Sequence, residues 1–67
     1  MKATTIHDLR SGQIYPALQD SRGRKVTTTF TTFDEDRALK YAELAAELSP
    51  HDDVNSVTWP KVKTNLI

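Results

Sequence analysis

The chain has 67 residues and no cysteine, and its nine basic residues balance its nine acidic ones. A chain of this length forms one domain, and the missing cysteines exclude disulfides and thiolate metal sites. The balanced charge lacks the positive excess that is usual in dedicated nucleic-acid binders, and no apolar run approaches the roughly 18 residues of a membrane helix. Since no apolar run follows Met1 to serve as a secretory signal, we expect a single cytoplasmic domain with no membrane contact and no cofactor.

The first twelve residues have the weakest pattern in the chain. Thr4-Thr5-Ile6 suits a short strand, and the residues up to Gly12 would then turn the chain back. An ordered arm that begins with one helical turn is the alternative. We favour the strand and keep both interpretations for residues 1–12.

Residues 13–32 predict a β-hairpin. Its first strand, 14–19, contains Pro16, which has no N–H to donate and therefore indicates an edge strand or a bulge. Asp20-Ser21-Arg22-Gly23 is a good turn sequence, because Asp is favoured at the first position of a type I turn and Gly tolerates the left-handed position that closes a hairpin.

The second strand of this hairpin covers residues 26–32. β-Branched residues dominate it, and they suit a pleated surface. Its alternation directs Val26 and Phe30 toward the core and places threonines on the other side.

Residues 33–48 predict a helix. Thr32, followed three residues later by Glu35, forms a capping box at its start. Apolar residues then recur at helical spacing and predict a buried face, which consists of Ala38, Tyr41, Ala42, Ala45 and Leu48. The helix ends before Pro50, because the residue that precedes a proline is disfavoured in helical geometry.

Residues 54–63 predict a final strand, with Val57 and Trp59 on one face. The expected fold is therefore a small single α+β domain with an antiparallel sheet and one helix packed on one face. The sheet has three strands, or four if residues 1–12 add one, in the order (β)-β-β-α-β.

No run of residues is typical of a catalytic or metal site. His7 and His51 each adjoin an aspartate, but sequence neighbours in loops rarely provide a base, its nucleophile and an orienting group together. His51-Asp52-Asp53 has no second cluster of ligands elsewhere, which favours a polar turn over a metal site. We therefore expect a protein that is not an enzyme and binds no metal.

Three surfaces are candidates for binding a partner: a basic hairpin tip, the polar face of the helix, and the C-terminal edge. Their residues are, in this order, Arg22, Arg24 and Lys25; Asp34, Glu35, Asp36, Lys40, Glu43 and Glu47; and Trp59, Lys61 and Lys63. Each surface has a structural alternative, namely a solvated turn, a solvated helix face, and a core position for Trp59.

The hairpin turn and the helix start read Q-D-S-R-G-R-K-V-T-T-T-F-T-T-F-D-E-D-R-A. This run resembles the hairpin-to-helix part of the arm-binding domain of phage-type tyrosine recombinases, which typically has a D-x-x-G-R turn, a strand ending in Phe-x-Thr and a helix that opens with acidic residues and Ala. The resemblance covers residues 15–48 and implies that Arg22, Arg24 and Lys25 occupy a DNA-facing hairpin. The chain differs from the family in its threonine-rich face, in lacking a catalytic domain, and in the strand expected after the helix.

The expected order of hairpin, acidic-capped Ala-rich helix and final strand is similar to the small RNA-polymerase inhibitors of certain coliphages. This second likeness is one of architecture and length, and no motif is shared. It implies a phage protein that binds and blocks one host enzyme. The function expected first is therefore a non-catalytic protein that binds and inhibits a host enzyme, or a host transcription or defence complex.

Two other functions stay open. A nucleic-acid-binding module would use the basic residues of the hairpin tip and C-terminal edge, which are Arg22, Arg24, Lys25, Lys61 and Lys63. The third is a structural subunit of a larger assembly, or a homodimer joined through sheet edges.

Overall fold

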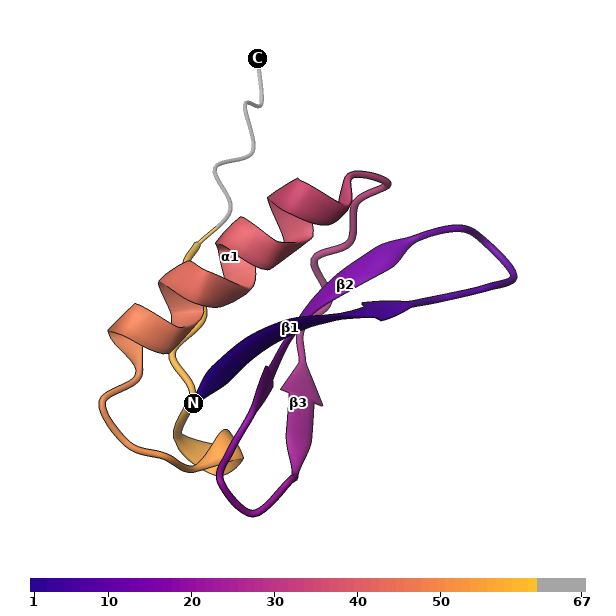
Figure 1. Cartoon of the computed structure of the whole chain (residues 1–67). Helices are drawn as coiled ribbons and strands as arrows, with labels where there is room; N and C mark the ends of the chain where they lie inside the picture. Colours follow the sequence, from indigo (N-terminus) through magenta and orange to yellow (C-terminus); the bar gives the residue numbers. More distant parts are fainter. Residues whose placement is uncertain (62–67) are drawn as a thin grey trace.

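The computed structural model describes residues 1–61, which form a three-stranded antiparallel sheet followed by one helix. The strands are β1 (Lys2–His7), β2 (Ile14–Gln19) and β3 (Lys25–Thr27), in the order β1-β2-β3, and the helix is α1 (Glu35–Leu48). The expected α+β class is confirmed, and residues 1–12 contribute a strand. Figure 1 shows α1 packed on one side of the sheet, where it contacts β1 and β2.

Leu18, in the central strand, anchors the core. Its cross-strand partners are Ala3 and Val26, so these three side chains share one face of the sheet. Ala42 and Ala45 of α1 pack on this face and are fully buried, as Leu18 is. Burying the Leu18 side chain contributes on the order of 2 kcal/mol. The inward direction expected for Val26 is confirmed, and the opposite face of the sheet is not covered by the helix.

Pro16 lies in the central strand, so the edge position that it suggested is wrong. β2 pairs with β1 without a bulge, and the irregular segment lies opposite Pro16, in residues 28–31. The second hairpin strand was expected to reach residue 32, but its ladder ends at Thr27, and the next pairing is the bridge between Ile14 and Thr32. The N–H of Ile14 donates to the carbonyl of Thr32, on the side of β2 that faces β3. Backbone N–H groups two residues apart in a strand point to the same side. The N–H that Pro16 lacks would therefore point toward residues 28–31. Because those residues bulge away from β2 and do not pair with it, the proline costs the sheet no hydrogen bond.

The start of α1 is capped by Asp34 and not by Thr32. Asp34 Oδ1 accepts hydrogen bonds from the N–H groups of Asp36 at 3.0 Å and Arg37 at 3.4 Å. Thr32 Oγ1 instead accepts from the N–H of Asp34 at 3.1 Å. The N-cap is thus two residues later than predicted, no capping box forms because Arg37 occupies the third helical position, and the helix begins at Glu35.

The final strand expected over residues 54–63 is absent from the described part, which ends at residue 61. Asp53 accepts a hydrogen bond from the N–H of Asn55 at 2.9 Å and caps a short 3₁₀ helix, Val54–Ser56. The chain then runs along α1 to residue 61, with the N–H of Thr58 donating to Ser49 Oγ at 2.9 Å. Val57 and Trp59 are partly buried and pack against the core, as in the core alternative for Trp59, but the strand pairing predicted for them is absent.

The order of elements in residues 1–61 is therefore β-β-β-α. The strand after the helix was one difference from the recombinase arm-binding domain, and the described residues do not have it. The same strand supported the likeness to the coliphage RNA-polymerase inhibitors, and that likeness loses its basis.

Candidate functional site

The face of the sheet opposite α1 presents polar and basic side chains. Side chains alternate between the two faces of a strand, so this face consists of the residues that lie between those directed at the helix. Its cross-strand rows are Lys2 with Gln19 and Lys25; Thr4 with Ala17 and Thr27; and Ile6 with Tyr15. Both lysines are exposed, and no aspartate or glutamate belongs to these rows. The charge within these rows is therefore positive, and the nearest carboxylates are those of Asp20 and Asp52, which line a hollow together with Lys2 and Gln19 at one end of the sheet.

The basic hairpin tip divides into a structural residue and two exposed ones. Arg24 donates from Nε to Asp20 Oδ2 at 2.9 Å, and its Nη2 lies 2.9 Å from the same oxygen and 3.4 Å from Asp53 Oδ1. Arg24 thus ties the turn to the loop after α1. Within residues 1–61, Arg22 and Lys25 form no ion pair, and both are exposed. These two are the tip residues that remain available to a partner.

Asp20 organises this turn from a buried position, with only 4% of its surface exposed. Its Oδ1 accepts hydrogen bonds from the N–H groups of Arg22 and Arg24, both at 3.0 Å. Burial by itself raises the pKa of Asp20, but the hydrogen bonds and charge of Arg24 and the N–H of Arg22 outweigh it, so the pKa is lowered from its ordinary value. Gly23 closes the turn at the expected left-handed position, with a φ of 83°.

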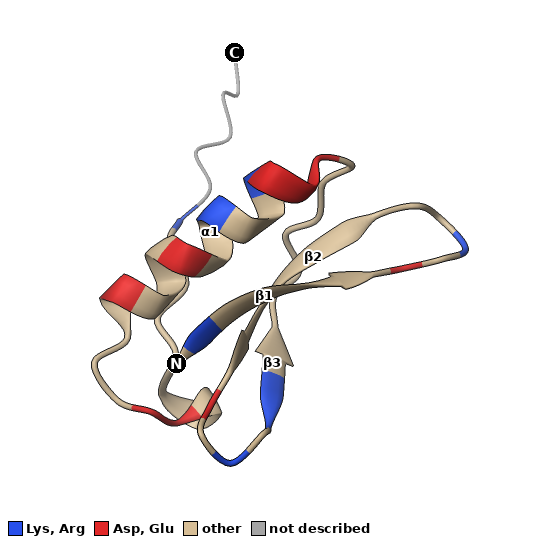
Figure 2. Cartoon of the chain, in the orientation of Figure 1, with Lys and Arg blue, Asp and Glu red and all other residues tan. Residues whose placement is uncertain are grey.

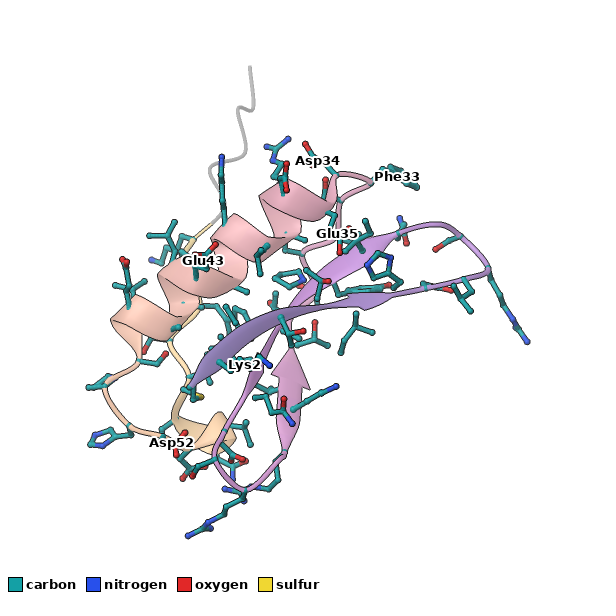
Figure 3. All side chains as sticks on the ribbon, in the orientation of Figure 1. Lys2, Phe33, Asp34, Glu35, Glu43 and Asp52 are labelled. Atoms are coloured by element: carbon teal, nitrogen blue, oxygen red, sulfur yellow. The ribbon has the colours of Figure 1, made fainter. Side chains whose placement is uncertain are left out.

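The loop after α1 is a structural partner of the same turn. Both carboxylate oxygens of Asp52 lie 3.2 Å from the N–H of Ser21, and the amino group of Met1 lies 3.9 Å from Asp52. Figure 3 places Asp52 beside the β2–β3 turn. Within residues 1–61, no group of three or more potential ligands is arranged to hold a metal ion. The run from His51 therefore serves as a polar turn.

The charges separate along the chain and in space. Residues 1–33 contain five basic and two acidic residues, whereas residues 34–48 contain two basic and five acidic ones. In Figure 2, the blue segments of the sheet lie on β1, β3 and the two strand connections, while most of the red lies on α1 and the loop after it. The neutral total hides a molecule with a positive sheet side and a negative helix side.

The residues predicted for the polar helix face have different environments. Asp34 caps the helix, and Glu35 Oε1 lies 3.3 Å from His7 Nε2 and 3.5 Å from Thr5 Oγ1. The remaining residues of this set are exposed, namely Asp36, Lys40, Glu43 and Glu47. Of the C-terminal edge residues, Trp59 packs against the core, Lys61 lies beside α1, and Lys63 lies outside the described residues.

The cluster of Thr5, His7 and Glu35 contains the residue types of a catalytic triad but not its geometry. Thr5 Oγ1 lies 3.5 Å from His7 Nε2, which is the same nitrogen that contacts Glu35. In a working triad the nucleophile and the orienting carboxylate occupy different ring nitrogens, so that one holds the ring while the other loses its proton. Here both contacts compete for one nitrogen. The cluster is therefore best described as a surface contact between β1 and the first turn of α1.

Sequence reasoning missed an apolar groove along α1. Its floor consists of Phe30, Tyr41, Leu44 and Pro60, and its rim of Arg37, Lys40 and Lys61. The groove has a volume of about 270 Å³. Among the residues that line it there is no carboxylate.

Aromatic stacking builds this groove. The ring of Tyr41 stacks on Phe30, with centroids 4.6 Å apart, and on Trp59, with centroids 6.1 Å apart. The Tyr41 hydroxyl donates to the carbonyl of Pro60, and burial raises the pKa of Tyr41. Leu44 and Leu48 extend the apolar surface, since 49% and 47% of their surfaces are exposed. Leu48 was predicted to be buried, and this prediction was wrong.

One signal in the sequence could have indicated the groove. Tyr41, Leu44 and Leu48 follow one another at helical i, i+3 and i+7 spacing, which makes an apolar stripe of its own. The alanines at 38, 42 and 45 form a second stripe. A three-stranded sheet can cover only one of them.

Searches of protein-family models, curated proteins and solved structures find no match to this chain. No helix within residues 1–61 has the length and apolar character needed to cross a membrane.

Proposed function

We propose that the protein binds double-stranded DNA through the face of the sheet that α1 leaves uncovered. The observation that carries the proposal is the charge on this face: Lys2 and Lys25 stand at its two edges, and no carboxylate belongs to its cross-strand rows. Phosphate contacts from such residues supply most of the affinity of non-specific DNA binding.

The dimensions of the sheet support this proposal. Neighbouring strands lie about 4.8 Å apart, so β1 and β3 are separated by about 10 Å. The major groove of B-DNA is about 12 Å wide. Proteins that read DNA with β-strands place them in a groove in this manner. Ala17 at the centre of the face has no exposed surface, so the larger side chains around it would make the contacts with DNA.

The side chains between the two lysines offer contacts to bases. Gln19 lies between Lys2 and Lys25 in the same cross-strand row, and a glutamine amide can pair with adenine in the major groove. Threonine can hydrogen-bond to either kind of base edge or contact the thymine methyl group. Thr4 and Thr27 flank Ala17, and because the Thr27 hydroxyl donates to the carbonyl of Pro16 at 2.6 Å, Thr27 would contribute its methyl group. The acidic helix lies on the other side of the sheet, away from the phosphates.

The resemblance to the recombinase arm-binding domain points the same way, since it implies a DNA-facing hairpin. Arg22 and Lys25 stay exposed at the positions that the resemblance assigns to DNA. Inhibition of a host enzyme, the function expected first from the sequence, stays a prediction. The likeness of architecture that favoured it depended on a strand after the helix.

Salt dependence of duplex binding tests the proposal. With phosphate contacts from Lys2, Arg22 and Lys25, affinity for a random-sequence duplex should fall roughly 40-fold between about 50 and 200 mM KCl. The Lys25→Glu variant should lose about tenfold in affinity, and the salt slope should decrease by about 1. Fluorescence anisotropy measures both quantities.

Lys61→Glu is the matched control, because it changes the net charge equally but lies in the groove on the helix side. Its affinity for DNA should stay within about twofold of the parent protein. Equal losses in the two variants would mean that only net charge matters, and the assigned face would be wrong.

A further inference from the structure

The groove along α1 has an apolar floor and an unneutralised basic rim. Arg37, Lys40 and Lys61 form no ion pair with any carboxylate of residues 1–61. No acidic residue is among those that line the groove. A ligand that complements it must combine an apolar group with negative charge.

The chain itself carries such a group. Phe33 is 73% exposed, and Figure 3 shows its side chain at the surface, where one edge of the ring lies near Gly12 of the β1–β2 connection. The three residues that follow it are Asp34, Glu35 and Asp36, all exposed. An aromatic side chain with three carboxylates beside it matches the groove in apolar character and in charge.

We propose that two copies of the chain associate, with Phe33 of one copy in the α1 groove of the other. Asp34 caps its own helix and Glu35 contacts His7, so the exposed carboxylate of Asp36 would be the one that faces the basic rim. Phe33 does not line the groove of its own copy, so the contact has to form between copies. It leaves the uncovered sheet face of each copy open and is therefore independent of DNA binding.

A second exposed apolar residue provides a matched control. Leu9 is 95% exposed, which is more than Phe33. Its neighbours in sequence are Asp8 and Arg10, so it lacks the run of carboxylates that complements the rim. If exposed apolar surface alone caused association, Leu9 would contribute as much as Phe33 does.

Sedimentation equilibrium without DNA, from about 10 µM to about 1 mM protein at low salt, tests this proposal. The weight-average mass should rise with concentration above the 7.6 kDa of one chain. Phe33→Ala should lower the association constant at least about tenfold, the effect of truncating an interface anchor. Leu9→Ala should leave it unchanged. Circular dichroism checks that both variants, each altered at an exposed side chain, remain folded.

Charge reversal separates this proposal from DNA binding. Lys61→Glu should weaken self-association and leave DNA affinity unchanged. Lys25→Glu should weaken DNA binding and leave self-association unchanged. A mass of one chain at every concentration would overturn the proposed association. So would equal effects of Phe33→Ala and Leu9→Ala, whatever the outcome of the DNA measurements.

Discussion

Asp20 shows how one buried carboxylate fixes the end of the sheet that carries Arg22 and Lys25. It accepts two backbone N–H groups of its own turn and pairs with Arg24, which also reaches Asp53. A buried charge is tolerated only when it is paired and hydrogen-bonded. Arg24 therefore belongs to the scaffold, although the sequence grouped it with Arg22 and Lys25 as a candidate for binding a partner.

Replacing Asp20 by asparagine should destabilise the fold at neutral pH. The amide oxygen can still accept the two N–H groups, but the charge that pairs with Arg24 is lost. Thermal unfolding at pH 7 should show a lower melting temperature for Asp20→Asn than for the parent. Glu43→Gln, at an exposed helix position, is the control and should change the melting temperature much less.

The pH dependence of this difference follows from the lowered pKa of Asp20. The ionised carboxylate contributes stability above the unfolded value, about 3.8, and this contribution is lost as the pH falls through the lower folded value. The parent and Asp20→Asn should therefore converge in acid. A gap in melting temperature that persists unchanged below pH 3 would show that the charge of Asp20 is not the cause.

At the scale of elements, the sequence predicted the sheet and the helix because their signals are local. The turn at Gly23, the alternation through Val26 and the alanine stripe of α1 all appear where they were expected. The prediction of a final strand was wrong because the segment that contains Val57 and Trp59 packs these side chains against the core and forms no backbone pairing with another strand. For Val57 and Trp59 the sequence pattern indicated a shared packing face but not the element against which they pack.

The groove was missed for a related reason. Leu48 was assigned to the buried face of the helix, but the sheet covers only the alanine stripe, and Leu44 and Leu48 are both exposed. Phe30 was expected in the second hairpin strand but lies in the bulge of residues 28–31, and its ring stacks on Tyr41. The bulge follows from Pro16, which lies in a different strand. Such an effect depends on strand order, and strand order is not visible in a local pattern.

The helix start offers a direct test of the corrected cap. Asp34→Ala should cost about 1 kcal/mol of unfolding free energy, because two N–H groups of the first turn lose their acceptor. Thr32→Ala removes an acceptor from the single N–H of Asp34 and should cost less. Chemical denaturation of the two variants measures both values. The opposite ranking would restore Thr32 as the cap.

At the scale of the whole molecule, the separation of charge determines which surface can bind which partner. A chain with nine charges of each sign would be a poor ligand for DNA if they were mixed evenly over the surface. Here α1 and its cap Asp34 carry five of the nine acidic residues, on the side away from the uncovered sheet face. The same acidic segment, next to Phe33, complements the basic rim of the groove.

The most direct test of DNA binding by the sheet is an NMR titration of the isotope-labelled protein with a short duplex at low salt. We predict that amide shift changes concentrate on β1, β2 and β3, including Thr4, Ala17 and Thr27, and that the exposed acidic residues of α1, Glu43 and Glu47, change little. Changes centred on α1 or its groove, or no change at all at low salt, would contradict the account.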